Sequence, residues 1–318
     1  MSHGIPCAPS SRMETQMVSK MAMAAILLLA GPTAAAEVTP TTPIVCSMCE
    51  GWNRPQKPFK IYGNTWYVGT NDLSALLVTS PNGHVLLDGA LPQSAPLIEA
   101  NIQALGFKLK DVKLILNSHE HFDHAGGIPA LQRASGATVA ASIRGAKVLR
   151  AGTVGKDDPQ FDPVKPFFLA KLEKVREVAD GETLTAGDLR ITAHYTPGHT
   201  PGGTSWTWTS CENGRCLNMV YADSLTPVSS EGFRFSGGNG APDISSAFQA
   251  TIDKVAALKC DVMVSNHPGF SQVMEKLAAR TDANNTFIDP TGCRKYAAAA
   301  SKRLANRLAT EAKQKAAR

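Results

Sequence analysis

The sequence lacks an apolar run long enough for a membrane span near its start. The run Met21–Ala30 has ten residues, whereas a spanning helix needs about 20. Arg12 and Lys20 precede this run, and the small residues 34–36 follow it as a cleavage site. This layout is typical of a secretory signal peptide rather than a membrane anchor. We therefore expect residues 1–36 to be removed and the mature protein to be periplasmic or secreted, without membrane attachment.

The body of the sequence lacks an excess of positive charge, although the whole chain carries a formal net charge of +5. Of the 32 Lys and Arg and the 27 Asp and Glu, eight bases and one acid lie in residues 294–318, and two bases and one acid lie in the leader. The rest therefore has 22 bases against 25 acids. This mildly acidic body disfavours a nucleic-acid partner. The basic C-terminal segment is typical of a solvated terminal helix, with a nucleic acid or an anionic membrane as the alternative partner.

The sequence also lacks a second C-x-x-C motif beside Cys46–Cys49, and it has no thioredoxin-like surroundings. A plain disulfide is therefore a better interpretation of this motif than a redox pair or half of a zinc site. If Cys7 leaves with the signal peptide, six cysteines remain in an oxidising compartment, where disulfides persist. Two of them flank a turn with Asn213–Gly214, which is a strong hairpin signal. The predicted disulfides are Cys46–Cys49, Cys211–Cys216 and Cys260–Cys293.

What the sequence does contain is a dense cluster of metal-ligand residues in the stretch 117–127, N-S-H-E-H-F-D-H-A-G-G. In an extended loop His119 and His121 point the same way, because side chains alternate with period two. Asp123 and His124 follow one step further on and can turn to a neighbouring point, so the spacing suits two adjacent metal ions. The alternative, a polar surface loop, needs three of the eight histidines to gather there by chance.

Two further histidines follow predicted strands in loops rich in proline and glycine. His199 lies in T-P-G-H-T-P-G-G, and His267 lies in N-H-P-G. Taken singly, a histidine in such a loop is more often a surface residue, but a dinuclear site needs about six protein ligands. We assign two ligand sets: His119, His121 and His199 to the first metal, and Asp123, His124 and His267 to the second. Imidazole and carboxylate ligands suit zinc, although iron or manganese would accept the same set.

The pattern of predicted elements is strands, a helix, a strand and a helix, followed by strands and helices again. One strand is expected over about Ile61–Val68, and the last helix from Thr291 to the end. With 43% hydrophobic residues the chain can bury a large core. The order suggests two similar halves whose sheets pack face to face with helices outside, so that loop-borne ligands meet at one rim.

The histidine cluster, the downstream T-P-G-H-T-P-G-G and the later H-P-G resemble the metallo-β-lactamase superfamily, and the chain looks like a class B, subclass 3 enzyme. The resemblance covers nearly all of the mature chain, from Gly51–Asn53 onward. The subclass rests chiefly on Y-A-D-S-L at 221–225, because subclasses with a cysteine zinc ligand carry it about where Ser224 stands. The resemblance implies a single domain over residues 37–318 that folds as an αββα sandwich, with two mixed β-sheets and helices on the outer faces.

The same resemblance implies two Zn²⁺ ions per chain and the hydrolysis of small-molecule substrates, the β-lactam antibiotics, by a metal-bound hydroxide. Such an enzyme confers antibiotic resistance and is expected here as a periplasmic monomer. Asp123 would both bind zinc and orient the hydroxide. Asp88 would orient a ligand histidine, with a simple turn aspartate as the alternative. The residues expected to contact the substrate are Ser224, Thr226, Trp66, Gln160 and Phe161.

Other interpretations stay open from the sequence. Trp66 could equally be a core residue, and the loop with Gln160 and Phe161 could be solvated. Some relatives carry a cysteine directly after V-G-T where this chain has Asn71. The rival functions are a glyoxalase II-like thioesterase or a lactonase, in which an aspartate near Asp223 bridges both metals, and a non-catalytic periplasmic zinc-binding protein with a closed site.

Overall fold

The computed structural model describes residue 39, residues 41–238 and residues 241–316. The expected signal peptide, residues 1–36, lies outside the described residues. Among the helices of the described part, none is both long and apolar enough to cross a membrane.

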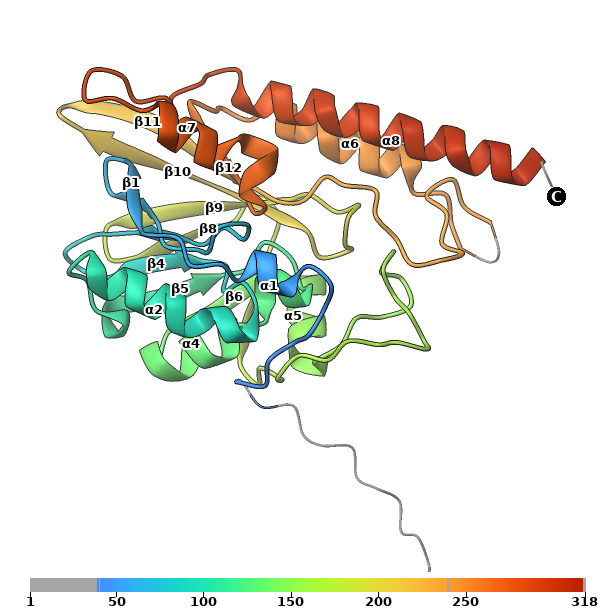
Figure 1. Ribbon diagram of the computed structural model, residues 1–318, viewed down its shortest axis with the longest axis horizontal. Helices are drawn as coiled ribbons and strands as arrows, with labels where there is room; N and C mark the ends of the chain where they lie inside the picture. Colours follow the sequence, from blue (N-terminus) through green and yellow to red (C-terminus); the bar gives the residue numbers. More distant parts are fainter. Residues whose placement is uncertain (1–38, 40, 239–240, 317–318) are drawn as a thin grey trace, which may run out of the picture. The chain divides into compact units, whose positions relative to one another are not determined.

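Two mixed β-sheets form the centre of the described part (Figure 1). The first sheet has seven strands in sequence order, of which β1 to β4 pair antiparallel and β4 to β7 pair parallel. These strands are β1 (Phe59–Tyr62), β2 (Thr65–Tyr67), β3 (Leu76–Val78), β4 (His84–Leu87), β5 (Val112–Leu116), β6 (Thr138–Ser142) and β7 (Val175–Val178).

The second sheet has five strands in the order β12-β11-β10-β9-β8. Strands β11 and β12 pair parallel, and the other neighbours pair antiparallel. The strands are β8 (Thr183–Ala186), β9 (Leu189–Tyr195), β10 (Thr204–Glu212), β11 (Arg215–Ala222) and β12 (Val262–Ser265).

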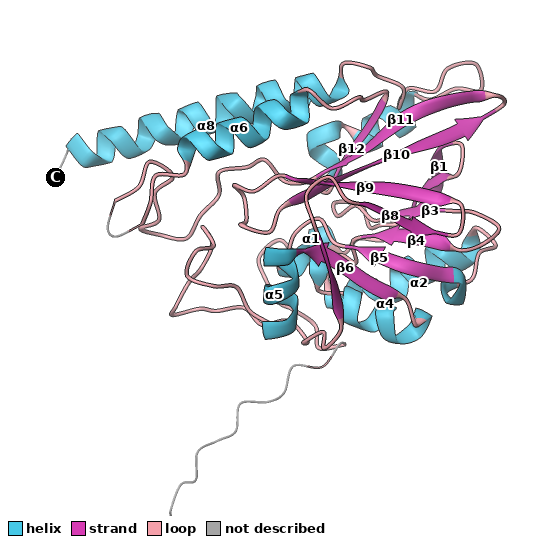
Figure 2. Cartoon of the chain, turned by 180° about the vertical axis from the view of Figure 1, so that it is seen from behind, coloured by secondary structure: helices cyan, strands magenta, loops and turns pink. Residues whose placement is uncertain are grey.

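Helices cover the outer faces of both sheets (Figures 1 and 2). Helices α2, α4 and α5 pack on the first sheet, and α6 and α8 pack on the second. The helices are α1 (Cys49–Trp52), α2 (Ala95–Ala104), α3 (Phe122–Ala125), α4 (Ile128–Ser135), α5 (Ile143–Ala151), α6 (Ser245–Ala256), α7 (Val273–Ala279) and α8 (Gly292–Ala316), with the 3-10 turns η1 (Pro92–Ser94), η2 (Leu109–Asp111) and η3 (Pro268–Ser271). The predicted αββα sandwich is confirmed.

The core follows the period-two alternation of the strands. Along β3, Leu77 packs with the helices of the first sheet, whereas Leu76 and Val78 face the space between the sheets. Trp206 and Tyr221 fill that space from the second sheet and are fully buried. Because alternate side chains point to opposite faces, each sheet contributes to an inner core and an outer core at once.

The single strand expected over Ile61–Val68 is wrong, because the chain turns back at Gly63–Asn64 to form the hairpin β1–β2. Gly63 has φ +52°, and a Cβ there would lie 2.5 Å from Ser210 Oγ. A Gly-Asn pair is a turn signal that the hydrophobic run around it obscured. The last helix was predicted one residue early and begins at Gly292.

Three disulfides are formed, between the cysteine pairs expected from the sequence: Cys46–Cys49, Cys211–Cys216 and Cys260–Cys293. The second pair lies directly opposite in the register of β10 and β11 and closes their hairpin. The third joins the start of α8 to the segment just before β12, so the longest helix is tied to the strand that precedes His267.

Candidate metal centre

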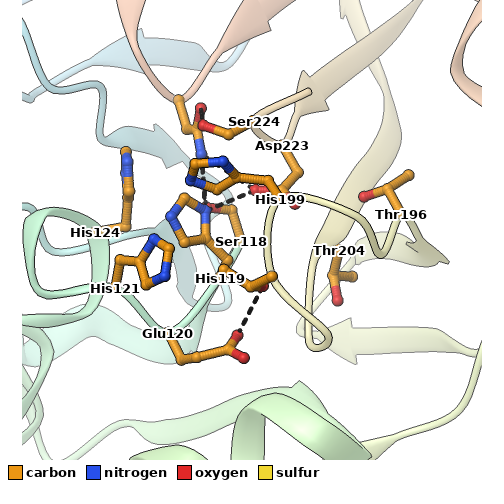
Figure 3. Close-up of polar contacts among 12 residues, drawn as sticks. Ser118, His119, Glu120, His121, His124, Thr196, His199, Thr204, Asp223 and Ser224 are labelled. Carbon is orange, nitrogen blue, oxygen red and sulfur yellow. Dashed lines mark hydrogen bonds and ion pairs between the residues drawn. The ribbon is translucent and has the colours of Figure 1, made fainter. Parts of the chain in front are cut away.

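Three loops, the first of which runs into the short helix α3 with Asp123 and His124, carry the expected ligands to one edge of the sandwich. They leave the carboxyl ends of β5, β9 and β12 as residues 117–121, 196–203 and 266–267. Backbone hydrogen bonds join them to neighbouring segments, for example from Thr204 N to Ser118 O at 2.7 Å. The histidines of the first two loops therefore face one another across a small space (Figure 3).

The three residues assigned to the first metal lie together and are buried. His119, His121 and His199 each offer a ring nitrogen, and the three nitrogens lie within 4.8 Å of one another. The ring centroids are 4.8 to 5.0 Å apart. Three imidazole nitrogens grouped this closely are a candidate donor set for one divalent ion.

The three residues assigned to the second metal also meet. Asp123 Oδ2 lies 3.3 Å from His124 Nε2 and 3.2 Å from His267 Nε2, and the two imidazole nitrogens are 3.2 Å apart. Asp123 and His124 also group with His119, whose ligand atom lies within 4.8 Å of theirs. The structure thus brings all six expected ligand residues into two adjoining groups.

Each of the five histidines turns one ring nitrogen toward this shared space and the other toward an oxygen of the surrounding protein. The outer contacts are His119 Nδ1 to Asp223 Oδ1 (2.7 Å), His121 Nε2 to Asp158 Oδ2 (3.1 Å), His124 Nδ1 to Asp88 Oδ2 (3.6 Å), His199 Nδ1 to Thr226 O (2.9 Å) and His267 Nδ1 to Asp72 O (3.3 Å). Outer oxygens within hydrogen-bond distance fix the tautomer and orientation of a metal-binding imidazole. This holds for all but His124, whose Nδ1 has no hydrogen-bond partner among the described residues. The inward atoms are then Nδ1 of His121 and Nε2 of the other four.

The inward atoms have the properties that a divalent cation requires. His119 Nε2 is buried and has no hydrogen-bond partner among the described residues, a costly state unless a ligand satisfies it. Burial, aided by the neighbouring His121, lowers the pKa of His199 to about 3 and keeps its imidazole neutral. Burial raises the pKa of Asp123, but His124 and His267 lower it further, so this carboxylate stays ionised. Burial lowers the pKa of His124, but Asp123 and Asp88 raise it to about 10, so this imidazole gives up a proton when it binds a cation. Imidazoles with one carboxylate are a zinc-type donor set.

Asp88 lies beneath the cluster and holds the loop that begins it. Its carboxylate accepts hydrogen bonds from Ser118 N (2.6 Å), Ser118 Oγ (2.6 Å), Asn117 Nδ2 (3.2 Å) and Tyr221 OH (2.9 Å). Its φ of +60° is unfavourable for a residue with a Cβ. Toward His124 the distance of 3.6 Å is that of an ion pair rather than a hydrogen bond. Asp88 therefore positions the ligand residues by holding Asn117 and Ser118, more than by contacting the imidazole of His124 directly.

The glycines after His199 let its loop pack against the first cluster. A Cβ on Gly203 would collide with Asp223 Oδ2 and Thr196 O, and a Cβ on Gly202 would lie 2.5 Å from Glu120 Oε2. Glu120 is buried and accepts a hydrogen bond from Thr200 Oγ1 at 3.2 Å. Thus Glu120 turns away from the ligand atoms and fixes the loop that carries His199.

A cavity of about 730 Å³ opens beside the cluster. Two of the residues expected to contact substrate, Gln160 and Thr226, line it. Ser224 is 1% exposed and donates to Asn266 Oδ1 instead, and Trp66 packs edge-on against Phe107 beneath the helices. Phe161 is half-buried and, like Ser224 and Trp66, is not among the described residues that line this cavity.

Some residues of the site were missed by reasoning from the sequence. Asp158, in the loop between α5 and β7, contacts His121 and also caps Gln160 N at 2.7 Å. Gln160 Nε2 in turn lies 3.3 Å from His199 Nε2. Trp52, at the end of α1, lies 5.5 Å from the ring of His267. The length of the loop was a signal of function, but nothing local indicated which of its residues face the histidines.

Comparison with known proteins gives the family to which the chain belongs. Residues 69–212 match the family described as the metallo-beta-lactamase superfamily. MEM-A1, a subclass B3 metallo-beta-lactamase isolated from a soil metagenome library, is 50% identical with a TM-score of 0.80, over 83% of this chain and 99% of that one. SMB-1, solved with mercaptoacetic acid, is 46% identical with a TM-score of 0.77, over 82% of this chain and 99% of that one.

The chain belongs to the metallo-β-lactamase superfamily. Within that superfamily it belongs to subclass B3, because the match extends over almost the whole length of such an enzyme. Among curated proteins, the hydroxyacylglutathione hydrolase of Maricaulis maris is 34% identical over 88 residues, which are 28% of this chain and 26% of that one. The chain spans between 26% and 59% of the length of the curated relatives that it matches.

Proposed function

We propose that this protein hydrolyses the amide bond of β-lactam antibiotics with two bound zinc ions and thereby confers antibiotic resistance. The observation that carries the proposal is the convergence of six ligand residues beside an open cavity, in a chain that is similar over its length to subclass B3 enzymes. His119, His121 and His199 would hold one ion, and Asp123, His124 and His267 the other. Zinc, when bound, supplies positive charge that polarises a carbonyl group and makes water more acidic.

The side chains around the cavity would orient the substrate and the attacking water. Asp123 lines the cavity and is ionised, so its carboxylate can accept a hydrogen bond from the water and hold it in line with the lactam carbonyl. Trp52, Phe167 and Phe270 supply apolar walls for the rings of the substrate. Lys165 supplies positive charge for the carboxylate that β-lactam antibiotics carry.

The position of Asp223 argues against the rival thioesterase or lactonase. In a thioesterase or lactonase of this kind, an aspartate near position 223 bridges both metals. Its oxygens must then face the space between the two ligand groups. Asp223 Oδ1 instead contacts the outer nitrogen of His119, and Asp223 belongs to neither group of metal-ligand atoms found among the described residues. The open cavity beside His121, His199 and His267 argues against a closed zinc-storage site in the same way.

We also infer that the mature protein is a periplasmic monomer. The signal-peptide pattern before residue 37 and the three disulfides support export to an oxidising compartment. The mildly acidic body supports a small-molecule substrate rather than a nucleic acid.

The test is hydrolysis of a chromogenic cephalosporin by the purified protein, with a glutathione thioester and a homoserine lactone as competing substrates. We expect turnover of the cephalosporin that a zinc chelator abolishes and added zinc restores. Absence of turnover in zinc-replete buffer would contradict the proposal. Faster hydrolysis of the thioester or the lactone would favour the rival function.

A further inference from the structure

A buried carboxylate near the end of α8 holds the loop that precedes α6. Glu311 is 2% exposed, although it belongs to the basic C-terminal helix. It accepts hydrogen bonds from Phe235 N (3.0 Å), Ser236 N (2.9 Å) and Ser236 Oγ (2.7 Å). Burying a carboxylate is costly unless it is paired and hydrogen-bonded, and Glu311 has both kinds of partner.

Arg307 lies one turn earlier on α8 and completes this arrangement. Its Nε donates to Glu311 Oε1 at 2.7 Å. Its Nη2 donates to Ser229 Oγ (2.7 Å) and to Phe233 O (2.9 Å), and its guanidinium lies 5.4 Å from the centroid of the Phe235 ring. The planar fork of arginine can make these contacts at once, which a lysine ammonium cannot reproduce.

The segment that Arg307 and Glu311 hold, residues 229–236, begins in one wall of the cavity. Val228, Ser229 and Ser230 line it, and the loop between β11 and α6 runs beside α8 in both views (Figures 1 and 2). Ser230 N also donates to Pro159 O at 2.9 Å. Pro159 directly precedes Gln160, whose amide contacts His121 and His199. Hydrogen bonds, joined by the peptide links Ser229–Ser230 and Pro159–Gln160, therefore lead from α8 to the rim of the metal centre.

We propose that Arg307 and Glu311 act as a clamp that positions the cavity wall 228–230 for substrate binding. Both are positioning residues, because they act through Ser229 and the backbone of residues 233–236 and touch no reacting atom. The inference rests on the proposed function, since it assigns the wall to the substrate of the same site. It also gives the basic C-terminal helix an intramolecular role, in place of a nucleic-acid or membrane partner.

The charge of Glu311 is part of this arrangement. Burial raises the pKa of Glu311, but the hydrogen bonds from Ser236, Arg307 and Phe235 outweigh it and hold the pKa below its usual value. The carboxylate is therefore ionised at neutral pH and can accept from two backbone N–H groups and the guanidinium together. Glutamine has the same shape, but its amide nitrogen would face donors, so Glu311→Gln removes contacts without removing volume.

The test combines hydrogen exchange with steady-state kinetics on the full-length mature protein. In Glu311→Gln and in Arg307→Lys we expect the amides of Phe235 and Ser236 to exchange at least tenfold faster, with the amides of β11 unchanged. The KM for a cephalosporin should rise roughly three- to tenfold while kcat stays within twofold, because the lost interaction holds ground state and transition state alike. Lys313→Gln, an exposed change on the same helix, should leave all of these values at the wild-type level.

Several results would overturn the clamp. Faster exchange with an unchanged KM would show that the wall does not bind substrate, and faster exchange that extends through β11 would show a role in global stability alone. Should either α8 variant fail to fold, Ser229→Ala removes one contact of Arg307 without altering the helix, and it should raise the KM about two- to threefold. If the wild-type protein leaves the cephalosporin intact, the proposed function fails, whereas unchanged exchange at Phe235 and Ser236 in Glu311→Gln is what refutes the clamp.

Discussion

At the scale of single residues, Asp223 separates the two hydrolase interpretations of this site. Its Oδ1 lies 2.7 Å from the nitrogen of His119 that faces away from the other ligands. An acceptor in that place orients the imidazole and raises its basicity, and loss of such a partner typically lowers metal affinity by about 10- to 100-fold. A bridging ligand, in contrast, bonds both ions, so its loss removes one bond from each and lowers the number of zinc ions that the chain holds at a given concentration.

We therefore expect Asp223→Asn to weaken zinc binding by about 10- to 100-fold and still to bind two ions per chain at saturation. Competition with a chromophoric chelator measures the affinity, and elemental analysis of the saturated protein gives the stoichiometry. Thr209→Ala, on the same sheet but away from the cluster, serves as the control. Saturation at one zinc per chain would show that Asp223 is a ligand. That result would favour the thioesterase or lactonase hypothesis.

A residue of the site could be predicted from the sequence when its partners lie close to it along the chain. Residues whose partners lie far away could not. His119, His121, Asp123 and His124 were predictable because four ligands stand within six positions. Asp158 was not, because its contact with His121 spans 37 positions and depends on how a long loop folds back. Ser224 was expected in the cavity by resemblance, yet its hydroxyl turns to Asn266.

At the scale of elements, α8 is fastened to the fold at both ends. Its first turn carries the Cys260–Cys293 disulfide, and Lys295 bonds Asp289 just before the helix at 2.9 Å. Its last turns carry the contacts of Glu311 with residues 235–236. Between these points its apolar face packs with α6 on the second sheet (Figure 1).

The disulfide Cys260–Cys293 is expected to stabilise the fold more than Cys211–Cys216, because it closes a longer loop. Cys260–Cys293 closes a separation of 33 residues, and Cys211–Cys216 closes one of five. Chain-entropy reasoning gives about 3–4 kcal/mol for the first and about 2 kcal/mol for the second. We expect the double change of Cys260 and Cys293 to serine to lower the free energy of unfolding in urea by more than the corresponding change at Cys211 and Cys216. Equal losses would show that chain entropy does not govern these bridges.

The prediction of elements failed where local signals competed. The run Ile61–Val68 has the hydrophobicity of one strand, yet the chain reverses at Gly63–Asn64. The φ of +52° at Gly63 and the closeness of Ser210 and Cys211 of β10 require glycine at this turn. The basic segment 294–318 was predicted as a helix, but its burial of Glu311 depends on a loop more than 70 positions away. Such contacts are tertiary and leave no trace in the pattern of the helix itself.

At the scale of the whole molecule, both sheets contribute to the site. The loop after β5 in the first sheet, together with the short helix α3 that follows it, supplies four expected ligands. The loops after β9 and β12 in the second sheet supply His199 and His267. Stacking the two sheets brings these strand ends to a common rim, beside the cavity that His121, His199 and His267 line. The repeat of elements along the chain predicted this architecture, because each half must bury one face of its sheet against the other.

The account as a whole is tested most directly by a zinc titration of the metal-free protein, with bound zinc and cephalosporin hydrolysis followed in the same samples. We predict no hydrolysis without zinc and a rise that reaches its plateau as occupancy approaches two ions per chain. A protein that binds two zinc ions and leaves the cephalosporin intact, or one that hydrolyses it equally well after metal removal, would contradict the account.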